Sequence, residues 1–347
     1  MPLQALQDGP IWLTGLIFLA AAVVVWTAGT RLTRALDAIS IRTGLGQAFV
    51  GMLLLGVITS LPEVANVLTA STGGVPDLAI NNLLGSAAIN ILLLALVDAA
   101  IGREALTSVV AAPATMMMTA LCMLVLGVVA VAITVGDTSV FGVGLWSVAI
   151  CALSVGSFAM AVSYGKRAPW MVKEAAAEEP QQGADEAPVD ASLPKLVAVA
   201  AITGALIFAA GYALSEMGDV LAEQTGLGTG LVGFLLIGLA TSMPELSSLT
   251  TAVRLRRYEM AFGQVLGTNF VNLSLFLLAD IAYSGGPVVG RLGKFEMLSA
   301  LLGLILIGVF QIGLLERRNP FVLRAGYDSI LVILLFFGGV GLLYVVR

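Results

Sequence analysis

Apolar runs of about 20 residues recur along the whole chain and are separated by short polar stretches. This is the length that an α-helix needs to cross the hydrocarbon core of a bilayer. The pattern predicts an all-α membrane protein with about ten transmembrane helices, each boundary good to roughly 2–4 residues. The expected spans are Ile11–Gly29, Gly46–Thr72, Leu78–Ile101, Val109–Val135, Val140–Tyr164, Leu196–Leu214, Leu227–Val253, Met260–Tyr283, Phe295–Leu315 and Asp328–Val346.

Composition agrees with this prediction and narrows the classes of protein. The chain has 347 residues, of which 59% are hydrophobic and 11% charged, and its mean hydropathy is +1.00. A soluble domain of this length would carry far more charge on its surface. No basic tract suggests a nucleic-acid partner, and no nucleophile–base pair suggests an enzyme or a resident cofactor. Cys122 and Cys151 lie in separate apolar segments without a redox or metal motif, so we expect them to be packing residues.

The basic residues predict the orientation of the chain. Fourteen fall on one side of the predicted spans: Arg31, Arg34, Arg42, Arg103, Lys166, Arg167, Lys173, Lys195, Arg254, Arg256, Arg257, Arg317, Arg318 and Arg324. Only Arg291, Lys294 and Arg347 fall on the other side. Because cytoplasmic loops carry the excess of Lys and Arg, we expect a multi-pass protein of the cell (inner) membrane with both termini outside. The lipid bilayer is the expected partner, and no protein partner is predicted.

One segment between the spans has a different composition. Residues 166–194 contain the stretch EAAAEEPQQGADEAPVD, which is rich in acids, Pro and Gln. Such a segment cannot bury a core, so we expect a solvated cytoplasmic linker. It divides the chain into a first five-helix repeat (1–165) and a second one (195–347).

The two halves repeat each other at a constant offset of 182 residues. GMLLLGVITSLPEV at Gly51–Val64 recurs as GFLLIGLATSMPEL at Gly233–Leu246, and NLLGSAAIN at Asn82–Asn90 recurs as QVLGTNFVN at Gln264–Asn272. About two residues in five are identical between positions 43–98 and 225–280, without a gap. Such a repeat marks a structural duplication. Because each half carries an odd number of spans, the copies are expected to be inverted relative to each other, a design that transporters use to form two related conformations.

The sharpest motif is a Thr-Ser-x-Pro-Glu sequence that occurs once in each half, with its glutamate at Glu63 and Glu245. A charged residue inside a membrane span is costly and indicates function. At 100° per residue the polar positions around each glutamate fall within an arc of about 120°. Each helix therefore presents one oxygen-bearing stripe: Thr59, Ser60, Glu63 and Asn66 in the first copy, and Thr241, Ser242, Glu245 and Ser248 in the second.

Further oxygens are expected from the main chain and from two neighbouring helices. Pro62 and Pro244 have no N–H, so the carbonyls of Ile58 and Ala240 lose their helical partners. Broken helices in transporters commonly present such carbonyls to cations. Polar ladders with i, i+4, i+8 spacing would supply the facing wall: Asn82, Ser86 and Asn90, and Gln264, Thr268 and Asn272.

These groups offer carboxylate, amide, hydroxyl and carbonyl oxygens, which suit calcium, sodium or magnesium rather than copper or zinc. Calcium tolerates irregular cages of about 6–8 oxygens, whereas magnesium demands a tighter geometry. Two glutamates would neutralise one divalent ion. Without a cation, burial and mutual repulsion favour protonation of the pair, so proton binding at the same place is physically reasonable.

Asp98 and Asp280 form a further matched pair whose role is ambiguous. Each lies about two helical turns beyond the last asparagine of its ladder, roughly 12 Å along the axis. This position is near the end of a span, where we expect a structural or vestibule role.

At these motifs the sequence resembles the cation/calcium exchanger superfamily, and in particular its sodium/calcium exchangers in their minimal prokaryotic form. The repeats of that family carry a G-T-S-x-P-E core and a later G-S-N-x-x-N segment, and the resemblance covers essentially the whole chain. It implies that Glu63 and Glu245 are the central calcium ligands, with the carbonyls of Thr59 and Thr241. It further implies sodium sites formed by the same glutamates, the hydroxyls of Ser60, Ser242, Ser86 and Thr268 and the carbonyls of Gly56 and Gly238, with Asn90 and Asn272 lining the cavity.

The sequence departs from the family pattern at several of these positions. Ile58 and Ala240 replace the first glycine of G-T-S, and Ala87 stands where the first G-S-N would have asparagine. Asn272 stands where potassium-dependent members carry aspartate, which argues against potassium co-transport. The linker is too short to hold the large regulatory calcium-binding domains of animal exchangers.

The leading functional prediction is sodium/calcium antiport by alternating access. The alternative is proton-driven exchange of calcium or another cation on the same fold. The absence of histidine removes the usual proton relay but does not exclude this alternative, because paired glutamates can carry protons. A cation channel is the third hypothesis, and it would conduct without saturable exchange.

Overall fold

The computed structural model describes residues 10–101, 105–110, 113–140, 142–167, 191–225, 242–316, 321–322 and 325–346. Within these ranges, eight helices are long and apolar enough to cross a membrane. A ninth candidate is the bent pair Gln47–Thr59 and Leu61–Thr72. The predicted span Leu227–Val253 begins in residues outside the described ranges. The all-α membrane fold is therefore confirmed.

The elements follow the same order in both halves of the chain. The first half contains α2 (Ile11–Thr43), α3 (Gln47–Val50), the π-helix η1 (Gly51–Leu55), α4 (Gly56–Thr59), α5 (Leu61–Thr72), α6 (Pro76–Ile101), α7 (Leu106–Val109), α8 (Pro113–Val135), the strands β1 (Ser139–Val140) and β2 (Val143–Gly144), and α9 (Leu145–Arg167). The second half contains α10 (Leu193–Thr225), α12 (Met243–Arg254), α13 (Tyr258–Ala282), the 3-10 helix η2 (Val289–Arg291), α14 (Lys294–Glu316), the strands β3 (Phe321–Val322) and β4 (Ala325–Gly326), and α15 (Tyr327–Val346).

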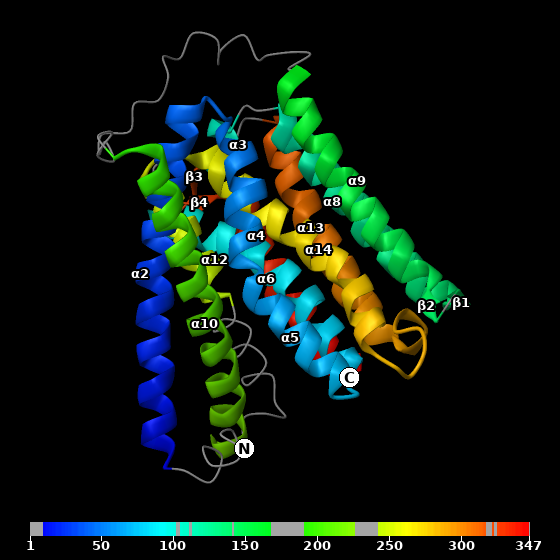
Figure 1. Cartoon of the computed structure of the whole chain (residues 1–347). Helices are drawn as coiled ribbons and strands as arrows, with labels where there is room; N and C mark the ends of the chain where they lie inside the picture. Colours follow the sequence, from blue (N-terminus) through cyan, green and yellow to red (C-terminus); the bar gives the residue numbers. More distant parts are fainter. Residues whose placement is uncertain are drawn as a thin grey trace.

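The corresponding helices of the two halves run in opposite directions. Figure 1 shows α2 and α10 side by side along one flank of the molecule, with α2 rising and α10 descending in that view. The helices α8 and α9 form the opposite flank, where α8 packs on α14 and α9 packs on α13. The helices α4, α5, α6, α12 and α13 lie between the flanks. The two repeats are therefore inverted, as the odd number of predicted spans required.

Two expected spans end earlier than the helices that contain them. The predictions Ile11–Gly29 and Leu196–Leu214 lie inside α2 and α10, each of which has 33 residues. Hydropathy reports which part of a helix faces lipid, whereas the helix itself ends where its backbone leaves the α-region. For α2 this happens at Gly44, which has a left-handed φ of 69°. The extension carries Asp37, which is buried and pairs with Arg257 at 2.7 Å.

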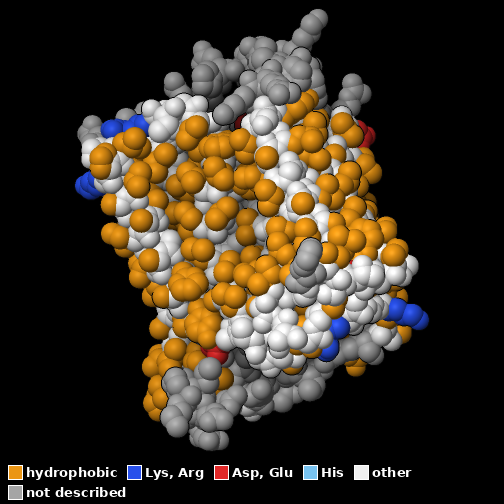
Figure 2. Space-filling model, turned by 45° about the vertical axis from the view of Figure 1, so that its right-hand side comes forward, with side chains coloured by type: hydrophobic (Ala, Val, Ile, Leu, Met, Phe, Trp, Pro, Cys, Tyr) orange, Lys and Arg blue, Asp and Glu red, His pale blue; other side chains and the backbone are white. Residues whose placement is uncertain are grey.

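The outer surface is apolar where a bilayer would cover it. Figure 2 shows hydrophobic side chains across the middle of one face, with Lys and Arg side chains near its upper and lower margins. Large apolar side chains on the flanking helices are strongly exposed, including Leu19 at 63% and Ile202 at 62%. A soluble protein would not leave a continuous surface of this kind in water. The chain is therefore integral to the membrane.

Glycines allow the broken helix of the first repeat to lie directly on α13. A Cβ added to Gly267 would come within 2.5 Å of the Met52 carbonyl oxygen. A Cβ added to Gly56 would lie 2.9 Å from the backbone nitrogen of Thr268. These distances leave no room for a side chain. The close approach places α4, which belongs to the first repeat, against α13 of the second repeat.

Candidate functional site

Each predicted glutamate lies in the first turn of a helix that follows a break. The helices α4 and α5 meet at Ser60, and the broken span bends there by 40°. Pro62 occupies the first turn of α5, where its missing N–H costs no hydrogen bond, and Glu63 follows it. In the second repeat α12 begins in the same way after Ser242. The kinked motif thus places a carboxylate at each helix N-terminus, where the helix dipole favours negative charge.

The two carboxylates lie deep inside the protein. Glu63 is 2% exposed and Glu245 is 1% exposed. They are near enough for the charge of Glu63 to act on Glu245, and the Thr59 hydroxyl lies close to Glu245. None of the four carboxylate oxygens has a hydrogen-bond partner in the described part of the chain. Buried carboxylates without partners are costly, so this arrangement indicates a site built for a cation or a proton.

The hydroxyl groups of the motif connect the two repeats. Thr59 Oγ1 and Thr268 Oγ1 lie 3.5 Å apart, across the contact between α4 and α13. The Gly56 carbonyl accepts a hydrogen bond from Ser60 Oγ at 2.8 Å and one from Thr268 Oγ1 at 3.4 Å. Gly56, Thr59, Ser60 and Thr268 therefore form one connected group of oxygens.

The polar ladders on α6 and α13 face each other. Asn272 Nδ2 donates to Ser86 Oγ at 3.1 Å, and Asn90 Nδ2 donates to Asn269 Oδ1 at 3.2 Å. Among the described residues, Asn90 Oδ1, Asn272 Oδ1 and Ser242 Oγ are buried and accept no hydrogen bond. The asparagines use their NH₂ groups for contacts between the repeats, which leaves their carbonyl oxygens free for a ligand.

Equivalent polar contacts hold each kinked helix on its neighbour. In the first repeat Asn82 Nδ2 donates to Asn66 Oδ1 at 3.4 Å. In the second repeat Gln264, which corresponds to Asn82, donates to Ser248, which corresponds to Asn66. Gln264 also donates to the Glu245 carbonyl at 3.3 Å. These contacts fix the direction of the helices that carry the glutamates.

The structure describes ten of the twelve predicted site residues, and all ten are buried. Thr241 and Gly238 lie outside the described residues, so the predictions for them remain predictions. Asn269 was not predicted, although it is fully buried and donates to the Ala87 carbonyl at 3.4 Å as well as accepting from Asn90. The sequence did contain a signal for Asn269, because it stands at the asparagine position of the family's G-S-N pattern in the second copy. In the first copy Ala87 occupies that position.

Asp98 and Asp280 lie apart from this region and have a different role. Asp98 Oδ1 accepts a hydrogen bond from the Leu106 N–H at 3.0 Å, and Asp280 Oδ1 accepts one from the Val288 N–H at 2.6 Å. Leu106 and Val288 correspond at the offset of the repeat. Each aspartate therefore fixes the segment that follows its own helix.

The second carboxylate oxygen of each aspartate reaches into the other repeat. Asp98 Oδ2 accepts from the Gly326 N–H at 3.3 Å, and Asp280 Oδ2 accepts from the Gly144 N–H. These glycines correspond to each other and end the hairpins β3–β4 and β1–β2. Asp98 Oδ2 also accepts from Ser329 Oγ at 2.6 Å. The pair thus joins the two repeats at two points, which is the structural role expected for it.

The chemistry of the described residues favours a hard cation. They contain no cluster of three or more His, Cys, Asp or Glu side chains. The site instead combines two carboxylates with neutral amide, hydroxyl and carbonyl oxygens. This set suits a calcium or sodium ion that must also leave again, rather than a tightly held transition metal.

Comparison with known proteins agrees with the resemblance seen in the motifs. Over 313 residues the chain is 25% identical to "Putative antiporter CaxA" of Alkalimonas amylolytica, covering 87% of this chain and 91% of that protein. It is 26% identical over 321 residues to the inner membrane protein YrbG of Escherichia coli (strain K12), covering 88% and 90%.

Solved structures show the same fold. The sodium-calcium exchanger NCX_Mj, soaked with 100 mM Na⁺ and 10 mM Sr²⁺, matches with a TM-score of 0.72 and 16% identity, covering 96% of this chain and 99% of the other. The same exchanger soaked without Na⁺ and Ca²⁺ matches with a TM-score of 0.69 and 17% identity, covering 96% and 100%. The family model for sodium/calcium exchanger proteins matches residues 13–164 and 195–345, which are the two repeats. The chain therefore belongs to the sodium/calcium exchanger family.

Proposed function

We propose that this protein exchanges calcium for sodium across the membrane by alternating access. Its family consists of cation antiporters rather than enzymes, which supports the class of activity. The observation that carries the proposal is the pair Glu63 and Glu245, whose four oxygens are buried without a partner among the described residues. Each repeat contributes one glutamate, so motion of one repeat against the other could expose the pair to either side in turn.

In this proposal one calcium ion binds between the two glutamates. Their two negative charges balance the ion, and neutral oxygens complete a cage of about 6–8 ligands. Among the described residues, the Thr59 carbonyl would be one of these neutral ligands. Asn90 and Asn272 would line the cavity. The resemblance to the family adds the Thr241 carbonyl.

Sodium ions would use an overlapping set of oxygens. The glutamates would be shared, and the buried hydroxyls of Ser60, Ser86 and Thr268 would supply further ligands. The Ser242 hydroxyl and the carbonyls of Gly56 and Gly238 complete the proposed set. Because the two kinds of ion compete for the same glutamates, occupation by one excludes the other, and this competition makes the process an exchange.

Proton-driven exchange is the second candidate. A proton on Glu63 or Glu245 would satisfy the same buried carboxylate oxygens as a cation does. The chain has no histidine, so the glutamates themselves would carry the proton.

We further propose an orientation in the cell (inner) membrane with both termini outside. The chain ends near the end of the bundle where α2 begins, opposite to the end where α9 stops and α10 starts (Figure 1). The positive-inside rule then places the segment between the repeats in the cytoplasm. The boundaries 1–165, 166–194 and 195–347 stay predictions.

Calcium uptake into proteoliposomes separates the two driving ions. We expect uptake when an outward sodium gradient is imposed at equal pH on both sides, and no uptake when a proton gradient is imposed without sodium. The reverse result would replace sodium by protons as the driving ion. Glu296→Gln provides a matched control, because Glu296 is also buried but binds the Gly293 N–H at 2.7 Å, outside the site. This variant should transport calcium like the wild type.

A further inference from the structure

A cavity outside the candidate site lies at one end of the molecule, between α2, α10 and α12. Its volume is about 590 Å³, which is in the range of small-molecule sites in proteins. Three arginines from two helices line it, namely Arg31 and Arg34 of α2 and Arg254 of α12. Among the residues that the structure describes, none that lines the cavity is an acid. We propose that this cavity binds the phosphate headgroup of an anionic phospholipid.

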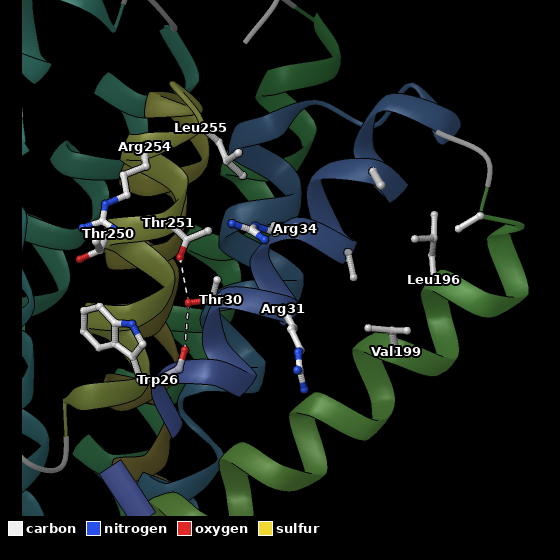
Figure 3. Close-up of a pocket in the computed structure, with 13 residues that line it drawn as sticks. Trp26, Thr30, Arg31, Arg34, Leu196, Val199, Thr250, Thr251, Arg254 and Leu255 are labelled. Atoms are coloured by element: carbon white, nitrogen blue, oxygen red, sulfur yellow. Dashed lines mark hydrogen bonds between the residues drawn. The ribbon is translucent and has the colours of Figure 1, made fainter. Parts of the chain in front are cut away.

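The floor of the cavity is a built polar surface. Thr251 Oγ1 donates to the Ser247 carbonyl at 2.8 Å and lies 3.3 Å from Thr30 Oγ1, which donates to the Trp26 carbonyl at 2.9 Å. Figure 3 shows this chain of hydroxyls in the centre, with Arg254 on one side and Arg34 and Arg31 on the other. Each hydroxyl can rotate away from its present acceptor and donate to an anion, and the three arginines line the same cavity.

The charge of these arginines is not neutralised within the described part of the chain. No ion pair joins Arg31, Arg34 or Arg254 to a carboxylate there, whereas Arg257 pairs with Asp37 and Arg291 pairs with Asp77. A guanidinium group presents several N–H donors in a planar fork that matches the oxygens of a phosphate. Three such groups around one cavity therefore favour an anion with several acceptor oxygens.

The position of the cavity indicates that this anion is part of a lipid. Leu196 and Val199 of α10 form its apolar wall. Along α10 the apolar surface continues on the outside of the bundle, where Val197 is 53% exposed and Ile202 is 62% exposed. A headgroup held by the arginines would thus have its acyl chains beside an apolar surface of the protein.

The cavity lies on the side of the membrane where anionic phospholipids are expected. The arginines of the cavity belong to the end of the bundle that the positive-inside rule places in the cytoplasm. The cytoplasmic leaflet carries the anionic lipids, and basic pockets between transmembrane helices on this side bind their headgroups. Trp26 supplies an amphipathic ring of the kind found at the headgroup level.

The test is lipid binding by the purified full-length protein, measured by native mass spectrometry. The probes are dioctanoyl phosphatidylglycerol, the zwitterionic dioctanoyl phosphatidylcholine, and inorganic phosphate. We expect the wild type to bind phosphatidylglycerol at least tenfold more tightly than phosphatidylcholine. The triple variant Arg31→Gln, Arg34→Gln, Arg254→Gln should lose this preference. Arg42→Gln should keep it, because it removes the same charge from the same helix outside the cavity.

Other results would overturn the proposal. If the triple variant keeps the preference, the lipid binds elsewhere. If inorganic phosphate binds as tightly as phosphatidylglycerol, the site takes a free anion rather than a lipid. If the wild type shows no preference, the cavity has another occupant or none. The single variants Arg34→Gln and Arg254→Gln should each weaken binding several-fold, which keeps the test valid if the triple variant fails to fold. None of these measurements depends on transport.

Discussion

The molecule contains two pairs of buried acids that correspond across the repeat, and the two pairs have opposite surroundings. In the described part of the chain no group lies in hydrogen-bonding geometry at the carboxylate oxygens of Glu63 and Glu245, although the Thr59 hydroxyl lies close to Glu245. Asp98 and Asp280 accept hydrogen bonds on both oxygens, from the loop of their own repeat and from the hairpin of the other. All four side chains are at most 2% exposed. Burial is therefore equal, and only the partners differ.

This difference separates the proposed transport site from a structural one. A buried acid whose oxygens are fully used by the protein has nothing left for an ion, and its contacts stabilise the fold. A buried acid without partners lowers the stability of the fold unless something else binds it. Charge inside a span indicates function in general, but the hydrogen bonds distinguish acids that the fold already satisfies from acids that would need another ligand.

The largest effect is expected at the glutamates. Glu63→Gln or Glu245→Gln should lower sodium-driven calcium uptake by more than 100-fold, because one of the two charges that balance the ion is lost. The amount of folded protein should not fall, since the change removes a buried charge without breaking a hydrogen bond.

A melting experiment checks the same prediction without transport. Calcium at 100 times its dissociation constant should stabilise the wild type by about 2.7 kcal/mol. This stabilisation should disappear in both glutamine variants and persist in Glu296→Gln. Calcium transport at the wild-type rate in either variant would place the cation elsewhere.

Substitution of the aspartates should have the opposite effect: stability should fall, and transport per folded molecule should remain. Asp98→Asn or Asp280→Asn replaces an acceptor oxygen by an NH₂ group that faces N–H donors, and should destabilise the protein by about 2–4 kcal/mol. The measurement is the melting temperature, together with the yield of monodisperse protein in detergent.

Transport per folded molecule should change little in these variants, and calcium should still raise their melting temperature. If instead they melted like the wild type and lost calcium uptake, the aspartates would belong to the transport pathway. The comparison between the two pairs would then fail.

Much of the fold follows from the sequence, because the signals are long and repeated. Apolar runs of membrane length predicted the spans, and the odd number of spans in each repeat predicted the inversion. The ends of α2 and α10 did not follow, because both helices continue past the apolar part of their sequence. Arg31 and Arg34 therefore extend a transmembrane helix, although hydropathy alone assigns them to a loop.

The candidate site was predictable where polar residues interrupt apolar helices at matched positions. The glutamates and the ladders met that condition. Asn269 did not, because its counterpart in the first repeat is Ala87 and a comparison of the copies does not mark it. The partners of Asp98 were also beyond the sequence, because Gly326 and Ser329 are more than 220 residues away.

The smallest expected effect is a change in stability at a serine that contacts Asp98 but has no equivalent contact at Asp280. Ser329 and Ser147 correspond across the repeat, but only Ser329 Oγ donates to its aspartate, at 2.6 Å. Ser147 Oγ is buried and has no partner in the described part of the chain. Removing a donor to a carboxylate costs about 1.5–3 kcal/mol, whereas removing a hydroxyl that makes no hydrogen bond costs nearly nothing. Ser329→Ala should therefore lower the melting temperature, and Ser147→Ala should leave it unchanged or raise it.

The serine pair tests whether partners, rather than position in the repeat, determine stability. Both substitutions remove the same atom from corresponding places in the fold, so each is the control for the other. Equal losses in the two variants would show that Ser147 also binds an aspartate in the membrane, and the two anchors would then be equivalent. Unequal losses would mean that hydrogen bonds, and not burial alone, stabilise these positions. In that case the same reasoning applies more strongly to Glu63 and Glu245, whose unpartnered oxygens leave them free to bind ions.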